Sequence, residues 1–406
     1  MNVLERKQYL NRLAELKDSP DIKIITGIRR SGKSMLLNTF MEYITRNFEK
    51  SNIIYLDLSL LKNESLLNYR SLNDFIVSSY IDGRANYLFI DEVQLCSGFE
   101  RVINSLHSEG KFDIYLTGSN AFLMSSDLAT LFTGRAIEIS MFPFSFSEFC
   151  EYFDEPDISS AFDKYVDIGG MPGCYQYRSR TEQKNYLRGV FETVLMRDLL
   201  ERHSIQNKLL LQRLGEFMLS NISNLTSFRS IANVLTTQLQ KVNHKTIGDY
   251  ISYMVDAFLF YKTNRYDIQG KSYLATIEKY YLVDHGFRSS ILGTKNMDYG
   301  RVYENIVAIE LYRRGYEVYV GKLYQNEIDF VAIKNNEKIY IQVSDDISRS
   351  DTLSREISPL LKIKDGYPKI LLANTKHQKT LQEGIPVIDI AHWLLGKEDG
   401  SIVSGR

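Results

Sequence analysis

The sequence has few of the residues on which disulfide-stabilised or membrane-spanning proteins depend. Three cysteines occur in 406 residues, Cys96, Cys150 and Cys174, and no two of them form a C-x-x-C pair. Neither a disulfide framework nor a zinc site is therefore expected. No stretch approaches the roughly 20 apolar residues that a membrane span requires, and the charged N-terminus lacks the apolar core of a signal peptide. These absences predict a cytoplasmic protein with reduced thiols and no membrane partner.

An excess of charge of one sign is also absent. The 49 lysines and arginines nearly balance the 50 aspartates and glutamates, which leaves a formal net charge of -1. Because the chain is no polycation, any binding of nucleic acid must come from a local basic face. A content of 44% hydrophobic and 24% charged residues is that of a globular protein. The length predicts two to four domains.

The pattern of apolar runs predicts an α/β fold. Between residues 22 and 141, short β-branched or aromatic runs alternate with charged segments of helical length, as parallel strands alternate with crossover helices. Helical patterns follow over 144–219, then two helices and a strand pair within 228–284, and then a second α/β region. In the first region, strands are expected over 22–27, 52–58, 86–93, 112–119 and 136–140.

The segment between the first strand and the next helix carries a phosphate-binding motif. It reads Gly-Ile-Arg-Arg-Ser-Gly-Lys-Ser and fits G-x-x-x-x-G-K-[ST] at every fixed position. Its glycines let backbone N–H groups curl around phosphate oxygens at the positive end of a helix dipole. Lys33 would reach the β- and γ-phosphates of ATP, and the Ser34 hydroxyl would bind Mg²⁺. The predicted nucleotide-binding residues here are Gly27, Ile28, Arg29, Arg30, Ser31, Gly32, Lys33, Ser34 and Met35.

A later strand of the same sheet ends in two acidic residues. The apolar run 87–90 is followed by Asp91 and Glu92. Asp91 is expected to bind Mg²⁺, and Glu92 to orient and deprotonate the attacking water. A strand that ends in two acids is weak evidence alone, but its place about sixty residues after the phosphate-binding motif makes it strong. The two motifs together predict binding and hydrolysis of Mg-ATP.

Two further positions have alternative interpretations. Ser119 or Asn120, after the fourth expected strand, would hold the attacking water, or would only form a polar turn. Arg135 would act as an arginine finger on the ATP of a neighbouring subunit, which implies a homo-oligomer, or would form a surface ion pair. Arg29 and Arg30 occupy free positions of the motif and would contact phosphate, a partner or solvent. The predicted catalytic residues are Lys33, Glu92, Asn120 and Arg135.

Taken together, these residues resemble a family of prokaryotic AAA-type, STAND-like P-loop ATPases with a C-terminal domain of unknown function. The resemblance covers nearly the whole chain. Besides the two nucleotide motifs, the matching segments are 116–149, 169–173, 279–288, 303–318 and 327–331. The resemblance implies an ATPase core over 1–150, a helical lid or linker over 151–205, a winged-helix-like domain over 206–290 and a degenerate restriction-endonuclease-like (PD-(D/E)XK-like) domain over 291–406.

The resemblance also implies a role for Pro172. In STAND-type ATPases a lid proline contacts the bound nucleotide, and Pro172 stands at the corresponding place in Gly-Gly-Met-Pro-Gly. From the residues alone, this segment is a helix breaker and a turn.

A metal-dependent nuclease of the restriction type needs a glutamate on a helix, an aspartate on a strand and Glu-x-Lys on the next strand. By the resemblance, Glu304 and Asp329 stand at the first two places. The third place holds Gln342 and Ser344, so a neutral amide replaces an anionic ligand and the lysine is missing. The remnant Glu304, Asp329 and Gln342 therefore predicts a nuclease-shaped domain that serves binding or assembly rather than cleavage.

The predicted recognition helix of the winged helix, 245–262, is rich in apolar and aromatic residues and has few basic ones. A helix that reads DNA displays Arg, Asn or Gln toward the bases, so a packing role is expected here. Three functions stay open: an ATP-driven switch that acts on nucleic acid through its C-terminal half, a switch with a protein partner, and an ATP-regulated nuclease. Scattered basic residues would form a face for the DNA backbone or, as is more common on helices, only a solvated surface; they are Arg197, Arg202, Lys208, Arg213 and Arg229.

Overall fold

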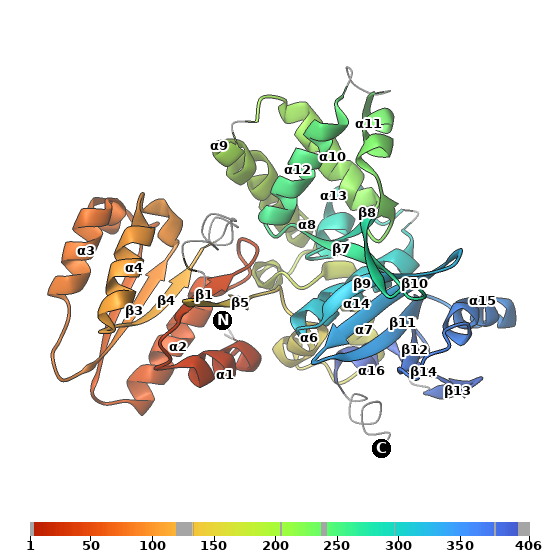
Figure 1. Cartoon of the computed structure of the whole chain (residues 1–406), viewed down its shortest axis with the longest axis horizontal. Coiled ribbons are helices and arrows are strands. Elements are labelled where there is room, and N and C mark those ends of the chain that lie inside the picture. Colours follow the sequence, from red (N-terminus) through yellow and green to blue (C-terminus); the bar gives the residue numbers. More distant parts are fainter. Residues whose placement is uncertain are drawn as a thin grey trace. The chain divides into compact units, whose positions relative to one another are not determined.

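The computed structural model describes residues 4–118, 132, 134–203, 205–236, 242–295, 297–376 and 379–396. The chain forms two compact units, Met1–Phe142 with Asp256–Phe258, and Pro143–Val255 with Leu259–Arg406. Each unit contains its own β-sheet (Figure 1). Within the described ranges, no helix is both long enough and apolar enough to cross a membrane.

The first unit is built on a parallel sheet of five strands in the order β2-β3-β4-β1-β5. The five strands predicted from the sequence are all present, and the α/β class is confirmed. Because the strands are parallel, the loops after β1, β3 and β4 leave the sheet at the same edge. The strands are β1 (Ile22–Thr26), β2 (Ser51–Asp57), β3 (Ala85–Asp91), β4 (Asp113–Thr117) and β5 (Ala136–Ser140).

Helices cover both faces of this sheet (Figure 1). Helices α1 and α2 pack on the face that contains Ile25, and α3 and α4 pack on the face that contains Ile24. Neighbouring residues of a strand point to opposite faces, so burial on both sides explains the continuous apolar runs of the sequence. The helical segments are α1 (Lys7–Leu16), α2 (Lys33–Asn47), η1 (Leu61–Leu67), α3 (Tyr69–Ser78), η2 (Val93–Leu95) and α4 (Phe99–Glu109).

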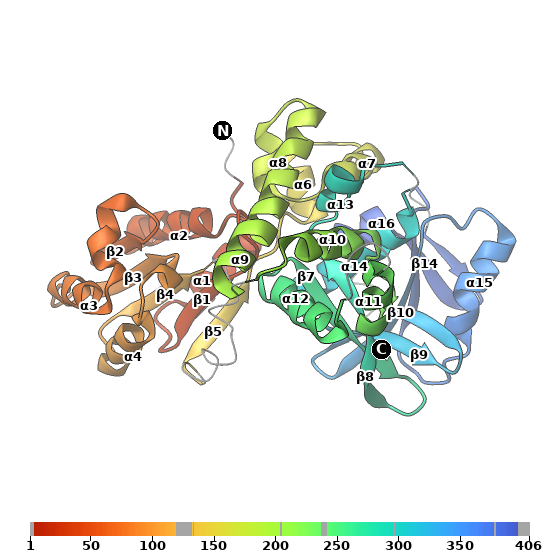
Figure 2. The same ribbon diagram turned by 90° about the horizontal axis from the view of Figure 1, so that it is seen from above.

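The second unit begins with helices, as the sequence predicts for residues 144–219. In both ribbon views α10, α11 and α12 lie side by side (Figures 1 and 2). The helical segments are α6 (Phe146–Phe153), α7 (Ile158–Ile168), η4 (Pro172–Gln176), α8 (Arg180–Thr193), η5 (Val194–Asp198), α9 (Leu199–His203), α10 (Lys208–Ser220), α11 (Phe228–Thr236), α12 (His244–Asp256), α13 (Gly286–Leu292), α14 (Tyr299–Arg313), α15 (Ser350–Leu361) and α16 (Ile390–Leu394).

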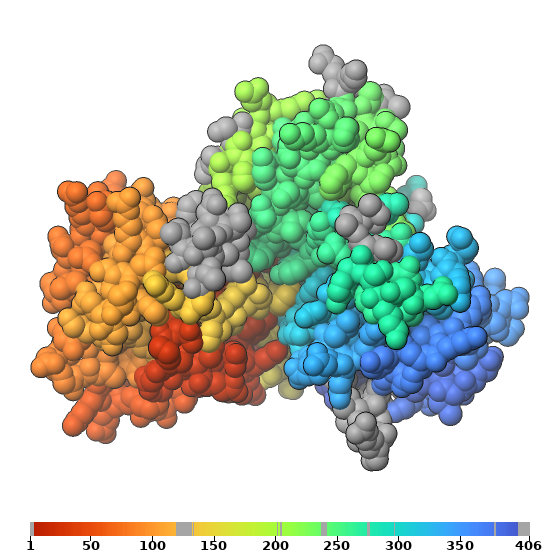
Figure 3. All heavy atoms as spheres, viewed as in Figure 1, coloured from red at the N-terminus to blue at the C-terminus, as the bar shows by residue number. Residues whose placement is uncertain are grey.

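A mixed sheet of nine strands, in the order β13-β14-β12-β11-β10-β9-β7-β8-β6, runs through the second unit. Its strands are β6 (Leu225–Thr226), β7 (Phe260–Asp267), β8 (Ser272–Leu282), β9 (Glu317–Leu323), β10 (Asn326–Lys334), β11 (Glu337–Ser344), β12 (Lys369–Ala373), β13 (Thr380–Gln382) and β14 (Ile385–Asp389). Strand β7 pairs with β8 antiparallel and with β9 in parallel. The hairpin expected in a winged helix therefore shares one sheet with the C-terminal strands, and their surfaces are continuous in Figure 3.

The predicted helix over 245–262 was wrong at its C-terminal end. Helix α12 stops at Asp256, Phe258 adopts a left-handed backbone with φ of 57°, and β7 begins at Phe260. The strand pair predicted within 271–284 is a single strand, β8, whose partner is β7. The apolar run around Phe258 fits either a helix or a buried strand, so its periodicity does not reveal the boundary.

Candidate active site

The phosphate-binding motif forms the turn between β1 and α2. Three of its residues have positive φ: Gly27 at 133°, Arg30 at 64° and Gly32 at 105°. A Cβ atom on Gly27 would lie 2.1 Å from the carbonyl oxygen of Met141, so only glycine fits at this position. Gly32 precedes the first residue of α2 and lets the chain turn into the helix.

Lys33, the first residue of α2, is directed into this loop. Its side chain is buried, with 5% of the residue exposed. The Nζ atom donates to the carbonyl oxygens of Gly27 at 2.9 Å and of Ile28 at 3.0 Å. The ammonium therefore adds a positive charge where the N-terminus of α2 already favours an anion.

The loop contains one buried hydroxyl group that suits a phosphate oxygen. Ser31 is fully buried, and its Oγ atom has no hydrogen-bond partner among the described residues. A buried polar group without a partner costs about 1–3 kcal/mol, which an acceptor from a ligand would offset. Arg6 holds the loop from behind, because its guanidinium donates to the carbonyl oxygens of Ser31 at 3.3 Å and of Phe142 at 2.8 Å. These residues fit the phosphate groups of a nucleotide.

The predicted metal ligands meet at the carboxyl edge of the sheet. Asp91 ends β3 and is 1% exposed, its carboxylate accepts a hydrogen bond from the Thr117 hydroxyl, and the Ser34 hydroxyl is near enough to lower its pKa. Burial raises the pKa of Asp91, and the two hydroxyls act in the opposite direction. The structure thus places Ser34 near Asp91, although 57 positions of sequence separate them.

Glu92 has a different environment from its neighbour. Its backbone is left-handed, with φ of 54°, and its N–H donates to Thr117 Oγ1 at 3.2 Å. The half-buried side chain accepts from Gln94 Nε2 at 2.5 Å. Asp91 is therefore enclosed by hydroxyls, whereas Glu92 extends from a turn at the same edge of the sheet.

Two of the remaining predicted residues of the first unit, Arg135 and Met35, form no side-chain hydrogen bond with this cluster within the described ranges. Ser119 and Asn120 lie outside the described residues. Arg135 is exposed and stands just before β5, whose first residue pairs with Ile22. In a parallel sheet this is the edge opposite the phosphate-binding loop, and Arg135 Nη1 lies 3.4 Å from Asn104 Oδ1. Met35 is about half exposed on α2.

Two residues of the site were not predicted from the sequence. Thr117 is the polar residue that ends β4, and β4 lies between β3 and β1 in the sheet. A polar residue directly after the apolar run 114–116 could have been recognised in the sequence as a candidate site residue. Arg6 gave no signal, because its contacts with Ser31 and Phe142 span 25 and 136 positions and depend on the tertiary fold.

In the second unit, the Gly-Gly-Met-Pro-Gly segment packs against Asp284. The Asp284 carboxylate accepts from the N–H groups of Gly170 at 2.6 Å and of Gly286 at 2.8 Å. A Cβ atom on Gly169 would lie 2.1 Å from Asp284 Oδ1, so this segment approaches as closely as glycine allows. Pro172 follows as the first residue of η4, and its predicted contact with a nucleotide stays a prediction.

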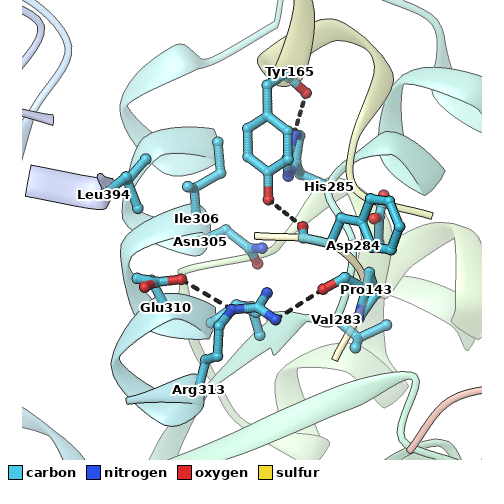
Figure 4. Close-up of a pocket in the computed structure, with 12 residues that line it drawn as sticks. Pro143, Tyr165, Val283, Asp284, His285, Asn305, Ile306, Glu310, Arg313 and Leu394 are labelled. Atoms are coloured by element: carbon cyan, nitrogen blue, oxygen red, sulfur yellow. Dashed lines mark hydrogen bonds and ion pairs between the residues drawn. The ribbon is translucent and has the colours of Figure 1, made fainter. Parts of the chain in front are cut away.

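A small polar cavity adjoins Asp284 (Figure 4). His285 bonds to the Tyr165 carbonyl oxygen at 2.7 Å, and Arg313 donates to Glu310 at 3.0 Å and to the Pro143 carbonyl oxygen at 2.9 Å. Burial raises the pKa of Asp284 and lowers that of His285. The cavity measures about 10 Å³, which is room for a single water molecule. Asp284, His285 and Arg313 thus all have hydrogen-bond partners within the second unit, and we interpret the cluster as part of its packing.

The nuclease-like residues do come together in the nine-stranded sheet. The Asp329 carboxylate on β10 accepts from the Val343 N–H on β11 at 2.8 Å, and the Asp329 N–H donates to Gln342 Oε1 at 3.3 Å. Glu304 on α14 accepts from Lys279 Nζ at 2.8 Å. Burial raises the pKa of Asp329, and the nearby negative charge of Glu304 raises it further.

The outer face of α12 does not resemble a surface that reads DNA. The inner face is buried, as its apolar residues predicted. The exposed face displays His244, Lys245 and Ser252, together with the acidic Asp249. Among the scattered basic residues, Arg213 pairs with Glu216 at 3.1 Å.

Comparison with known protein families also separates an N-terminal region of the chain from the region that follows it. A family model described as an AAA domain matches residues 19–150, and one described as a domain of unknown function (DUF8612) matches residues 159–298. An uncharacterised protein of Haemophilus influenzae is 36% identical over 399 residues, which cover 97% of this chain and 99% of that protein. An uncharacterised protein of Methanocaldococcus jannaschii is 28% identical over 384 residues, which cover 90% of this chain and 84% of that protein.

Among solved structures, one similar structure is the Orc1 protein of Aeropyrum pernix in complex with DNA, which is 11% identical in sequence. The aligned region covers 77% of this chain and 95% of the Orc1 chain, with a TM-score of 0.32. A TM-score of this size is too low to establish a common overall fold. The structural evidence for a nucleotide site is therefore the five-stranded sheet and the residues at its edge.

Proposed function

Because the chain belongs to the family of AAA-domain proteins that includes the Haemophilus influenzae relative, we propose that it is an ATPase. The first unit binds ATP with Mg²⁺ at Gly27–Ser34 and hydrolyses it. The observation that carries the proposal is the buried Asp91 carboxylate, held by Thr117 at the carboxyl edge of the parallel sheet, the same edge at which the phosphate-binding loop follows β1. A hydroxyl at the end of a phosphate-binding loop and a carboxylate at the end of a neighbouring strand are the protein ligands of Mg²⁺ in P-loop NTPases.

Different residues of the loop would contact different parts of the triphosphate. The loop N–H groups, the Ser31 hydroxyl and the N-terminus of α2 would bind phosphate oxygens, and Lys33 would exchange its bonds to loop carbonyls for the β- and γ-phosphates. Ser34 and Asp91 would hold Mg²⁺, which when bound neutralises charge on the phosphates.

In the hydrolytic step, Glu92 would accept a proton from the attacking water. The water oxygen then bonds to the γ-phosphorus while the bond from that phosphorus to the β–γ bridging oxygen breaks, which yields ADP and phosphate. Thr117 serves as a positioning residue, since its hydroxyl contacts the Asp91 carboxylate and the Glu92 backbone. Asn120 is proposed to hold the same water.

Arg135 is proposed to act on the ATP of a neighbouring subunit. Its exposure, and its place at the amino edge of the sheet, support action across an interface and argue against action within its own chain. A guanidinium supplied in this way stabilises the charge that develops on the transferred phosphoryl group. The chain would then be active as a homo-oligomer, and Pro172 would link the nucleotide to the second unit.

We propose that ATP binding and hydrolysis drive a conformational switch, and that the switch acts on nucleic acid through the second unit. A protein partner is the alternative, and the acidic Asp249 on the exposed face of α12 favours it. Fluorescence anisotropy with labelled single- and double-stranded DNA at low salt separates the two, because phosphate contacts weaken steeply as salt rises. Binding that weakens with salt supports nucleic acid, and no binding even at low salt leaves the protein partner.

The proposed activity is tested by a steady-state ATPase assay of the full chain and of Asp91→Asn. The parent protein is expected to release phosphate from ATP in the presence of Mg²⁺. Phosphate release should stop when EDTA removes the ion. Asp91→Asn keeps the size of the side chain but loses its charge, so turnover should fall. An unchanged rate in Asp91→Asn would remove the proposed metal ligand from the mechanism.

A further inference from the structure

The nuclease-like centre of the second unit contains a buried positive charge. Lys279, on β8, is 2% exposed. Its Nζ atom lies 2.8 Å from Glu304 Oε1 and 2.7 Å from Glu327 Oε1. A lysine ammonium has three N–H donors, so the carboxylates of α14 and β10 take two of them. The sequence showed no lysine at the usual place on β11, and the structure supplies one from another strand.

One carboxylate oxygen of Glu304 and one of Asp329 already accept hydrogen bonds within the protein. Glu304 Oε1 also accepts from the Tyr281 hydroxyl at 2.7 Å, and Asp329 Oδ2 accepts from the Val343 N–H at 2.8 Å. The Gln342 amide is used at both ends, since its oxygen accepts from the Asp329 N–H and its nitrogen donates to Glu356 at 3.1 Å. Within the described ranges, no group of three or more His, Cys, Asp and Glu side chains is arranged to hold a metal ion.

We infer that the Lys279 ammonium takes the place of the divalent ion that a nuclease of this type requires, so that the centre binds no metal and cuts no nucleic acid. Hard divalent ions need several oxygen ligands at about 2.0–2.6 Å. A second cation at that distance from Glu304 would meet an ammonium already bonded to the same carboxylate, and the two positive charges would repel. The residues therefore do not fit the metal, and the second unit acts through its shape and surface.

Lys279 and a divalent ion are therefore alternative occupants of one position. Removal of Lys279 should leave Glu304, Glu327 and Asp329 with no internal cation. Uncompensated buried charge destabilises a folded protein strongly, so Lys279→Ala should unfold at a lower temperature. A divalent ion should then restore part of the loss, because it binds the folded state and not the unfolded chain.

The first measurement needs no change in the centre. Full-length Asp91→Asn, which removes the proposed metal ligand of the nucleotide site, is titrated with Mn²⁺ without nucleotide, and free Mn²⁺ is followed by electron paramagnetic resonance. We expect no binding at micromolar Mn²⁺ and no nicking of supercoiled plasmid with Mg²⁺ or Mn²⁺. Mn²⁺ binding or nicking that disappears when Asp329→Asn is added would overturn the inference.

The second measurement adds Lys279→Ala to the same background and records thermal unfolding in EDTA and in millimolar Mn²⁺. We expect a lower Tm in EDTA and a rise with Mn²⁺. Lys262→Ala is the matched control, because Lys262 pairs with Glu278 at 2.6 Å on the same hairpin but is more exposed; its Tm should not respond to Mn²⁺. A Tm of Lys279→Ala that is equally indifferent to Mn²⁺ would contradict the exchange of cations. If Lys279→Ala does not fold, Lys279→Met repeats the test.

Discussion

The Thr117 hydroxyl donates to the Asp91 carboxylate at the centre of the proposed active site. The same oxygen accepts from the Glu92 N–H at 3.2 Å, so one side chain holds both acidic residues of β3. Thr117 is fully buried at the end of β4, which pairs with β3 and β1. The strand order of the sheet thus determines the geometry of the acidic pair.

Thr117→Val removes this hydroxyl and keeps the shape of the side chain. We expect kcat for ATP to fall by about 10- to 100-fold, because small misplacements of catalytic groups cost that much. KM should change little, since the hydrogen bonds of the Thr117 hydroxyl go to Asp91 and Glu92 and not to the phosphate-binding loop. Thr117→Ser is the matched control and should keep most of the activity. Equal kcat for Thr117→Val and the parent would show that the hydroxyl does not position the acids.

Lys33→Ala should weaken ATP binding. The lysine supplies a charged hydrogen bond to phosphate, and such bonds contribute about 1.5–3 kcal/mol, so Kd should rise roughly 10- to 150-fold. Titration of a fluorescent ATP analogue measures the change. Lys111→Ala is the control, because Lys111 is an exposed lysine of the same unit that pairs with Glu109. If both variants bound the analogue as the parent does, the loop would not be the nucleotide site.

Glu92→Gln should separate binding from turnover. The amide preserves the size of the side chain but cannot accept a proton, and loss of a general base costs about 100- to 10,000-fold in kcat. The Kd for ATP should stay close to that of the parent. Single-turnover hydrolysis measures the chemical step directly, with Glu109→Gln as a control. A rate in Glu92→Gln near the parent's would mean that another group accepts the proton.

The Arg135→Ala variant alone should lose ATPase activity. Oligomers that contain both Arg135→Ala and Lys33→Ala subunits should regain part of this activity. Subunits with Arg135→Ala keep an intact phosphate loop, whereas subunits with Lys33→Ala keep an intact Arg135. A mixture places functional Arg135 next to a functional loop at some interfaces, so its activity should exceed that of either variant alone. No gain at any mixing ratio would count against action between subunits.

Gly27→Ala should destabilise the first unit. The new Cβ atom would lie 2.1 Å from the Met141 carbonyl oxygen, at a backbone with φ of 133°. Overpacking adds about 1–3 kcal/mol to the roughly 1–2 kcal/mol of backbone strain. Gly83→Ala is the control, since Gly83 has φ of 76° and nothing within 4 Å of the added atom. Urea unfolding compares the two, and equal losses would mean that the loop readily moves away from Met141.

The sequence predicted the first unit well because each of its features is local. A parallel strand buried on both faces, such as Leu88–Ile90, is a continuous apolar run, and the fixed spacing of Gly27, Gly32 and Lys33 defines the loop. The nearness of Ser34 to Asp91 follows, since the loop that leads from β1 to Ser34 and the end of β3 at Asp91 lie at the same edge of one parallel sheet.

The features that escaped prediction depend on partners far apart in the sequence. The alternation of residues in β7 does not reveal that β9 is its parallel neighbour, so the shared nine-stranded sheet was not foreseen. Lys279 lies 25 positions before Glu304, on a strand with no nuclease motif, and only the fold brings its ammonium to that carboxylate. The pairing of strands and the ion pairs between distant residues depend on tertiary packing. Local sequence patterns therefore do not reveal them.

The most direct test of the proposed function is isothermal titration of the purified full chain with ATP, in Mg²⁺ and in EDTA, with circular dichroism to establish that the protein is folded. We predict one ATP per chain, with affinity that falls when Mg²⁺ is removed and falls further in Ser34→Ala. A folded chain that takes up no ATP at millimolar concentration with Mg²⁺ present would contradict the assignment of residues 27–34 as a nucleotide site.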